Sequence, residues 1–273
     1  MKSEEIRKLT SEATDQLIAA LREGRSETLT HFLATMAQFR RYSLGNIMLI
    51  AAQRRDATRV AGFRTWNKLG RFVKKGEKGI FVLAPIMRLK TESPDNLELK
   101  ESTNPTGFRA VYVFDISQTD GQGLPAICDV SGDPREYPGR LSKFVVRLGI
   151  VLEYSADIAP ALGTSAGGKI TLLPGQSPAQ EFVTLAHELA HELMHRTERR
   201  NTISKCIREM EAEAVAFVIS QAIGLDTILA AKDYIELYRG DATLLTESLE
   251  LIQLTANSIL EGISAEEDSS PAG

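Results

Sequence analysis

The sequence predicts an α+β protein of two domains, residues 1–125 and 126–273. At 273 residues, the chain is longer than one typical domain. Helical and strand-like patterns occur in groups along it. The charge is also divided, because residues 1–125 carry 20 Lys and Arg against 14 Asp and Glu, whereas residues 126–273 carry 12 against 22. A basic half joined to an acidic half indicates a module that binds a polyanion, attached to a second module with another task.

The first domain is predicted to begin with helices and to continue with strands. Apolar residues recur at helical spacing in three segments, and Ser43 can cap the third. These segments are residues 6–21, 28–39 and 43–54. Strand-like runs follow at residues 60–63, 80–87 and 108–114. Residues 91–107 are polar and contain two prolines, so we expect an exposed loop there.

The second domain is predicted to be mostly helical with a small sheet. A segment rich in Gly, Pro and Asp, residues 121–139, predicts the linker before it. The elements expected beyond the linker are a helix at 141–151, strands at 152–156 and 169–173, and helices at 182–195, 208–217, 227–238 and 243–262. Residues 264–273 are acidic and rich in small side chains, which predicts a frayed end.

Composition excludes several classes of protein. A hydrophobic share of 43% and a charged share of 25% are ordinary for a soluble globular protein. No run approaches the 18 or so apolar residues of a membrane span, and the first residues lack the apolar core of a signal peptide. We therefore expect a cytoplasmic protein with no membrane partner. Cys128 and Cys206 are too few for a disulfide framework and are expected to be reduced.

Residues 187–191 read His-Glu-Leu-Ala-His inside a predicted helix. Because residues four apart lie on one face of a helix, His187 and His191 can present two imidazoles to one metal ion. Zn²⁺ in a catalytic site takes three protein ligands and leaves a position for water, whose proton a nearby carboxylate can accept. Glu188 is suited to that role. The sequence therefore predicts a zinc site with Glu188 as general base.

The third metal ligand is predicted to be Glu209. Zinc peptidases with a glutamate ligand often resemble the pattern E-x-x-A-[D/N/E], in which the first residue binds metal and the last orients a histidine. Residues 209–213 match this pattern, with Glu213 in the last position. Glu211 is an alternative, because it begins a variant of the same spacing. His195 is a further alternative, but it lies about 80° around the helix from His187, so we expect it beside the site.

Residues 62–80 interleave aromatic and cationic side chains and contain the only tryptophan, Trp66. Proteins hold single-stranded nucleic acid with this combination, because cations contact the phosphates and flat side chains stack on the bases. The alternative is that Phe63, Trp66 and Phe72 belong to a hydrophobic core and that the lysines form a solvated hairpin turn. The segment taken alone leaves both interpretations open.

These motifs together resemble a known family. Tyr42-Ser43-x-x-Asn46, Gly62-Phe63-x-Thr65-Trp66 and the glycine-rich basic run at residues 70–80 resemble the N-terminal single-stranded-DNA-binding domain of ArdC-type antirestriction proteins, which also occurs in TraC-type plasmid primases. The motifs at 187–191 and 209–213 resemble those of SprT-like or ImmA/IrrE-like zinc peptidases. A third histidine, His195, is nearer to the ImmA/IrrE pattern.

The resemblance implies an α+β module that binds single-stranded DNA, followed by a zincin-type metallopeptidase domain that acts on a protein substrate the sequence does not identify. It further implies an antirestriction protein of plasmids and other mobile elements, which acts on DNA-associated proteins or shields incoming DNA. Tyr234 could steady an oxyanion during catalysis. The residues expected to contact DNA are Tyr42, Asn46, Arg64, Trp66, Lys68, Arg71, Lys74, Lys75 and Lys78.

Two other functions stay open. In the first, the protein is a DNA-binding shield without catalysis, and the zinc ion is structural. In the second, it is a regulatory peptidase of the ImmA/IrrE type that cleaves a repressor, and the basic segment is only a solvated hairpin.

Overall fold

The structure of this protein is a computed structural model, which confirms the predicted α+β class and divides into two compact units. The first unit contains residues 1–16 and 41–125, and the second contains residues 17–40 and 126–273. The residues that the structure describes are 3–22, 26–86, 89–90, 100–101, 107–121, 136–196, 199–225, 227 and 242–264.

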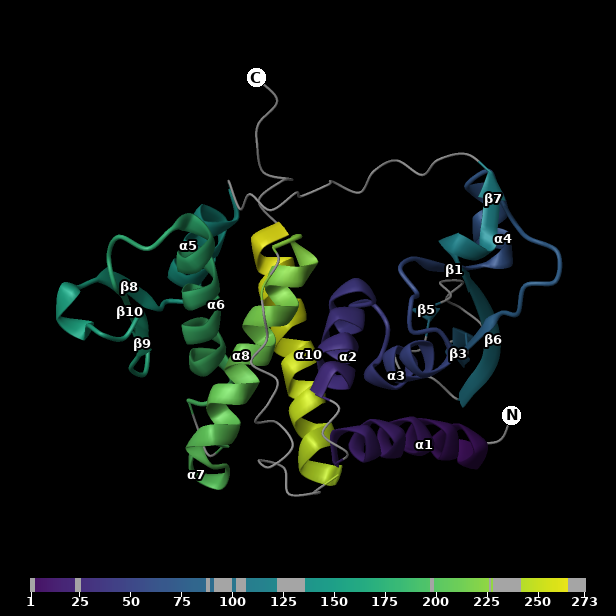
Figure 1. The fold of residues 1–273 in the computed structure, drawn as a ribbon, viewed down its shortest axis with the longest axis horizontal. Coiled ribbons are helices and arrows are strands. Elements are labelled where there is room, and N and C mark those ends of the chain that lie inside the picture. Colours follow the sequence, from purple (N-terminus) through teal and green to yellow (C-terminus); the bar gives the residue numbers. More distant parts are fainter. Residues whose placement is uncertain are drawn as a thin grey trace, which may run out of the picture. The chain divides into compact units, whose positions relative to one another are not determined.

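An antiparallel sheet with the strand order β1-β6-β3 forms the centre of the first unit (Figure 1). Its strands are β1 (Val60–Gly62), β3 (Ile80–Ile86) and β6 (Gly107–Asp115). Two short antiparallel pairs accompany it, β2 (Arg71–Val73) with β7 (Thr119–Gly121) and β4 (Leu89–Lys90) with β5 (Lys100–Glu101). The helices are residues 3–16 of α1 (Ser3–Arg22), α3 (Leu44–Gln53), α4 (Phe63–Lys68) and the 3₁₀ turn η1 (Ile116–Gln118).

Most elements of this unit match their predictions. Ser43 caps α3 as expected, since its hydroxyl accepts a hydrogen bond from the backbone N–H of Asn46 at 3.4 Å. The core forms where α3 covers one face of the sheet, and it includes Ile47, Ile80 and Val113. The helix α4 was not predicted, because its six residues are too few to show a helical period.

Two side-chain amides bind the outer edge of β3, which is an edge strand of its sheet. The Asn46 amide donates to the carbonyl of Leu83 at 2.9 Å and accepts from its N–H at 2.8 Å. Gln53 does the same for Phe81, at 2.8 and 2.9 Å. Both amides come from α3, so this helix satisfies backbone groups that a further strand would otherwise pair.

The second unit packs helices against a three-stranded sheet of order β8-β10-β9. β10 is parallel to β8 and antiparallel to β9. The strands are β8 (Val151–Tyr154), β9 (Gly163–Ser165) and β10 (Lys169–Leu172). The helices are α2 (Ser26–Gln38), α5 (Tyr137–Arg147), the 3₁₀ turn η2 (Ala156–Ile158), α6 (Pro178–Met194), α7 (Arg199–Thr202), α8 (Lys205–Ala222) and α10 (Ala242–Ser264). Figure 1 shows α6 between the sheet and α8, with α10 and α2 against α8.

The two central helices begin at clear capping signals. Ser177 caps α6 by accepting from the N–H of Gln180 at 3.3 Å, and Pro178 occupies the first turn. Ser204 caps α8 in the same way, with the N–H of Ile207 at 3.3 Å. The predicted helices at 182–195 and 208–217 are therefore confirmed as parts of α6 and α8, although α6 ends at Met194 and His195 is its C-cap.

One predicted boundary in this unit is wrong. The helix expected at 141–151 is α5, which ends at Arg147. Gly149 then adopts a positive φ of 73°, and Val151 begins β8. Since a left-handed residue cannot continue an α-helix, the apolar residues after it enter the sheet instead.

The helix α2 lies in the second unit, although its residues fall within the predicted first domain. It buries Leu29, Phe32, Leu33 and Met36 and packs against α8. An amphipathic helix buries its apolar face wherever a complementary surface lies, and here that surface follows in the chain by more than 160 residues. The compact units therefore differ from the predicted ranges by residues 17–40.

Several predictions fall outside the described residues. These are the helix at 227–238 with Tyr234, most of the linker at 121–139, Cys128, and residues 265–273. Most of the loop predicted at 91–107 also falls outside them, but β5 occupies two of its positions. Among the described helices, none is long and apolar enough to cross a membrane.

Candidate metal centre and nucleic-acid interface

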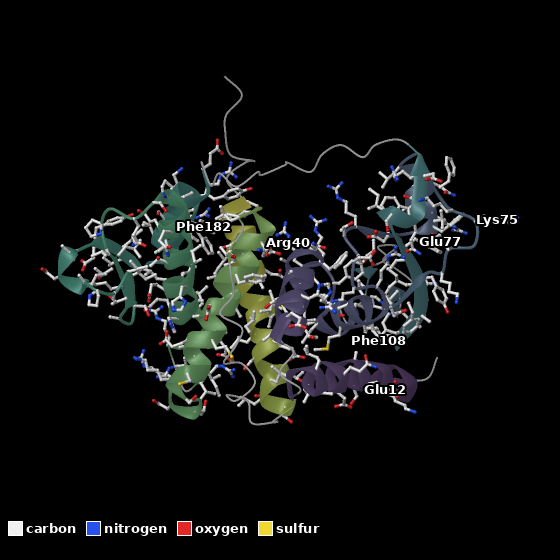
Figure 2. The ribbon with its side chains drawn as sticks, in the orientation of Figure 1. Glu12, Arg40, Lys75, Glu77, Phe108 and Phe182 are labelled. Atoms are coloured by element: carbon white, nitrogen blue, oxygen red, sulfur yellow. The ribbon has the colours of Figure 1, made fainter. Side chains whose placement is uncertain are left out.

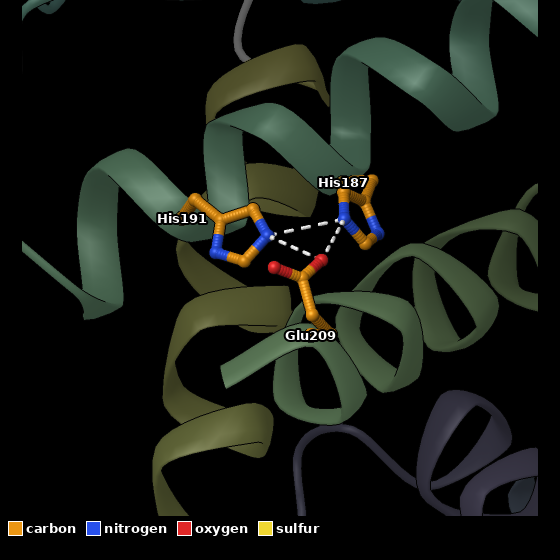
Figure 3. Close-up of side chains that lie close together, drawn as sticks. All are labelled: His187, His191 and Glu209. Carbon is orange, nitrogen blue, oxygen red and sulfur yellow. Dashed lines mark hydrogen bonds and ion pairs between the residues drawn. The ribbon is translucent and has the colours of Figure 1, made fainter. Parts of the chain in front are cut away.

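Three predicted metal ligands meet between α6 and α8 (Figure 3). The Nε2 atoms of His187 and His191 are 3.1 Å apart. One carboxylate oxygen of Glu209 lies 3.5 Å from Nε2 of His187 and 3.4 Å from Nε2 of His191. The two histidines lie one turn apart on α6, and Glu209 projects from α8 towards them. The local helical spacing thus places two of the groups, and the packing of α8 against α6 supplies the third.

The donor set fits a divalent transition metal. Two imidazole nitrogens and one carboxylate oxygen, all within 4.8 Å of one another, are the ligand types that Zn²⁺ takes in catalytic sites. The side chain of Glu209 is half exposed, which leaves an open side to the cluster. The neighbouring imidazoles of His187 and His191 hold the pKa of the Glu209 carboxyl far below its ordinary value. Glu209 is therefore a carboxylate over the whole physiological range.

Glu188 lies beside this cluster and is largely buried, with 8% of its surface exposed. Burial raises the pKa of the Glu188 carboxyl, although the neighbouring histidines and a hydrogen bond with Ser165 oppose the shift. Gly163 of β9 packs against it so closely that a Cβ atom there would lie 2.8 Å from Cγ of Glu188. The edge strand β9 therefore lies directly beside the carboxylate.

The structure separates Glu211 and His195 from the metal ligands. Glu211 is fully buried, and its carboxylate accepts hydrogen bonds from His195 at 2.8 Å, from Arg199 and from Ser248. His195 is buried too, and its Nδ1 lies 2.9 Å from Nδ1 of His191. Burial lowers the pKa of His195 even though Glu211 opposes the shift, which favours the neutral imidazole.

Sequence reasoning missed three residues at this site. Arg199 and Ser248 bind the buried carboxylate from α7 and α10, and no motif marks either of them. Gly163 is also unmarked in the sequence, although the strand-like run after it is recognisable.

Glu213, the last residue of the predicted glutamate motif, follows Glu209 by one helical turn and is partly buried.

Trp66 is a core residue of the first unit, which corrects its assignment as a stacking residue. Only 2% of its surface is exposed, and its indole N–H donates to the carbonyl of Phe114 at 2.8 Å. A nucleic-acid base has no access to such a ring. Asn46 is corrected for a related reason, since it is buried and both ends of its amide bind Leu83 in β3.

The other predicted DNA contacts divide into two groups. Arg71 is half-buried and binds the strand β7, because its Nε donates to the Thr119 hydroxyl at 2.8 Å and an Nη donates to the Thr119 carbonyl at 3.0 Å. Tyr42 is also half-buried, and burial raises the pKa of its phenol. The remaining predicted cations are exposed; they are Arg64, Lys68, Lys74, Lys75 and Lys78.

A row of aromatic rings, of which three are exposed and two half-buried, lies on the same unit and was not predicted. Tyr112 is 61% exposed, and its ring lies 6.3 Å from that of its cross-strand partner Phe81. Phe114, two residues along β6, lies 6.5 Å from the exposed ring of Phe63. Phe108 extends the row at the start of β6 and is labelled in Figure 2 together with Lys75. We call Phe63, Phe81, Phe108, Tyr112 and Phe114 the aromatic face.

The fold and site together define a two-domain protein whose second domain is of the peptidase type. Residues 155–251 match the family model described as the IrrE N-terminal-like domain. Residues 7–114 match the model of the N-terminal domain of the anti-restriction factor ArdC. The chain is an ArdC-like protein, with these two domains in one polypeptide.

Two solved structures share the fold of this chain, and one curated relative matches it in sequence. The metal-free crystal structure of the antirestriction ArdC protein from plasmid R388 matches with a TM-score of 0.57 and 21% identity, covering 94% of this chain and 98% of that one. Its Mn(II)-bound structure matches with a TM-score of 0.53 and 20% identity over 93% and 98% of the two chains. An uncharacterized protein of Bacillus anthracis is 25% identical over 85% of this chain, which spans only 47% of that relative.

Proposed function

We propose that this protein is a single-stranded-DNA-binding, zinc-dependent endopeptidase that acts on DNA-associated proteins in antirestriction. The observation that carries the proposal is the meeting of His187, His191 and Glu209 beside the buried carboxylate of Glu188. A bound Zn²⁺ would supply Lewis-acid activation of water and of a peptide carbonyl.

The chain's own residues provide the remaining requirements of peptide hydrolysis. Glu188 accepts the proton of the attacking water and returns it to the leaving amine, and a carboxyl with a raised pKa suits both steps. The strand order leaves one edge of β9 without a partner strand among the described residues. An extended peptide can pair with such an edge, which passes directly beside Glu188. A substrate held there would have its backbone next to the base.

The aromatic face supports binding of single-stranded DNA by the first unit. Its exposed rings, Phe63, Phe108 and Tyr112, offer bases a surface for stacking, and exposed lysines and arginines in the same unit attract phosphates. Tyr112 takes the role that the sequence assigns to Trp66. The contacts need no particular base sequence, which is consistent with a protein that meets varied incoming DNA.

Glu188→Gln tests the catalytic part of the proposal. We expect the variant to bind as much zinc as wild type, because the three ligands are unchanged, and to lose cleavage by at least about a hundredfold, because general-base catalysis contributes ~10²–10⁴. Cleavage of a bacterial proteome-derived peptide library, read by mass spectrometry of new N-termini, gives the measurement. If Glu188→Gln protects DNA from restriction in a transfer assay as well as wild type does, the protein acts as a shield instead.

Tyr112→Ala tests the DNA-binding part. One lost stacking contact corresponds to ~1–3 kcal/mol, so the affinity for a fluorescent oligothymidylate is expected to fall by about tenfold. Tyr154→Ala is the matched control, because Tyr154 is an exposed ring on the second unit. Equal affinity of wild type and Tyr112→Ala at low salt would exclude the aromatic face as the DNA-binding surface.

The IrrE N-terminal-like match also favours a second function, that of a regulatory peptidase with a repressor as substrate. Under this function, cleavage would not depend on DNA. Incubating the enzyme with a DNA-binding protein as substrate, with and without single-stranded DNA, separates the two functions, since only the first predicts that DNA-bound proteins are cleaved preferentially.

A further inference from the structure

A buried chain of hydrogen bonds leads away from the proposed metal ligand His191. Nδ1 of His191 lies 2.9 Å from Nδ1 of His195, and Nε2 of His195 lies 2.8 Å from a carboxylate oxygen of Glu211. His195 is 2% exposed and Glu211 is fully buried. Solvent therefore does not compete for these bonds, and the protein alone decides which atom donates and which accepts.

The direction of each hydrogen bond follows from the group at the far end of this series, the Glu211 carboxylate. An ionised carboxylate can only accept, so the hydrogen of His195 is on Nε2, facing Glu211. The neutral ring then has its lone pair on Nδ1, which accepts from Nδ1–H of His191. That leaves the lone pair of His191 on Nε2, the atom that lies 3.4 Å from Glu209 and 3.1 Å from Nε2 of His187.

Glu211 is held in place by partners from two further helices. Arg199 of α7 donates to both carboxylate oxygens, and the Ser248 hydroxyl of α10 donates to one of them. The guanidinium compensates the buried negative charge, so Glu211 can stay ionised inside the protein. The Glu211 carboxylate is therefore a fixed acceptor at the end of this series of hydrogen bonds.

We propose that His195 and Glu211 are positioning residues that fix the tautomer and ring orientation of His191, so that its Nε2 lone pair points into the metal centre. This proposal rests on the proposed metal-binding function of His187, His191 and Glu209. It assigns a task to His195, the residue that caps the C-terminal end of α6, which belongs to the metal-ligand group in neither the sequence prediction nor the structure.

His195→Phe tests the proposal, because it fills a similar volume but cannot accept the hydrogen of His191. We expect the affinity for Zn²⁺, measured by competition with a chromophoric chelator, to fall by about 10–100-fold, as is typical when the partner of a metal-bound histidine is lost. His195→Asn keeps an acceptor close to the position of Nδ1 and is expected to recover part of this loss. His31→Phe, on α2, is the matched control and should bind zinc like wild type.

The tautomer itself gives a readout that a merely structural role would not change. In the metal-free wild type, ¹⁵N NMR should show the His191 hydrogen on Nδ1, and in His195→Phe a substantial fraction should move to Nε2. Glu211→Gln offers His195 a group that can donate as well as accept, so it should shift the same signal and weaken zinc binding.

Three outcomes would overturn the proposal. They are wild-type zinc affinity in a folded His195→Phe protein, an unchanged His191 tautomer in that variant, and an equal loss of affinity in His195→Asn and His195→Phe. Circular dichroism and the thermal midpoint of each metal-free protein show whether it is folded. Since zinc affinity and tautomer are measured without a peptide substrate, a protein that binds zinc but cleaves nothing would refute the proposed peptidase and leave this inference standing.

Discussion

The side chain of Asp115 holds the backbone of two neighbouring segments by hydrogen bonds. It is fully buried at the end of β6, and its carboxylate accepts from the backbone N–H groups of Thr58 at 2.7 Å, Arg59 at 2.9 Å and Ser117 at 3.0 Å. The Gln118 side chain accepts from the N–H of Asp115, which completes a capping box. Burial raises the pKa of Asp115, but these hydrogen bonds lower it more, so that it lies below its ordinary 3.8.

The lowered pKa of Asp115 predicts acid sensitivity of the first unit. Because the folded state holds the proton more weakly than the unfolded state, Asp115 stabilises the fold fully above about pH 5, and this contribution is lost as the pH falls through 3.8 towards the folded pKa. Asp115→Asn should cost ~1–3 kcal/mol at pH 7 and should reduce the loss of stability in acid. Urea unfolding between pH 3 and pH 7 checks this. Parallel pH profiles of the two proteins would contradict it.

The candidate site shows which single residues a sequence can predict and which it cannot. Helical spacing predicted that His187 and His191 share a face, since local geometry decides this, and the motif at residues 209–213 predicted Glu209 as their neighbour. The structure brings these three side chains together. The fate of Trp66 and Tyr112 was not accessible in the same way. Tyr112 lies on β6, and alternation shows that a strand has two faces, but only the tertiary fold decides which face meets the core. Trp66 lies on α4, a helix of six residues, which is too short for a helical period to mark its buried side.

At the scale of elements, β9 packs tightly against α6 beside the candidate site. A Cβ atom on Gly163 would lie 2.7 Å from Cγ2 of Thr184 and 2.8 Å from Cγ of Glu188. Such distances are shorter than real side chains allow. The strand can thus lie beside the general base only because residue 163 lacks a side chain.

Gly163→Ala is therefore expected to move β9 or Glu188. Overpacking of this kind costs ~1–3 kcal/mol, and peptide cleavage should fall together with stability. The thermal midpoint and the library assay measure the two effects. Gly139→Ala in α5 is the matched control, because a Cβ there meets nothing within 4 Å. Wild-type activity and stability in Gly163→Ala would mean that β9 is not held against α6.

At the scale of the whole molecule, the two compact units differ from the predicted domain ranges by residues 17–40. Helices and strands were largely predictable, because periodicity and capping are local signals. The change of charge near residue 125 coincides with one limit of the compact units. The membership of residues 17–40 depends on a contact between α2 and α8, far apart in the chain. No local pattern carries that information.

A fragment of residues 126–273 is accordingly predicted to be unstable. It would lack α2, whose side chains Leu29, Phe32, Leu33 and Met36 pack in the core of the second unit, and it would expose the facing surface of α8. We expect a lower thermal midpoint than in the full chain and binding of a hydrophobic dye. A synthetic peptide of residues 17–40 should raise the midpoint, whereas a scrambled peptide should not. A fragment as stable as the full chain would show that α2 is dispensable.

The amides of Asn46 and Gln53 bear on how separate copies of this protein behave in solution. An open sheet edge is a template for strands of other molecules, and chains that join in this way can polymerise. Here the outward N–H and C=O groups of Phe81 and Leu83 are already bonded by α3. The exposed rings of the aromatic face can thus stay accessible to a ligand, while Phe81 and Leu83 of β3 have no free backbone groups with which a strand of a neighbouring molecule could pair.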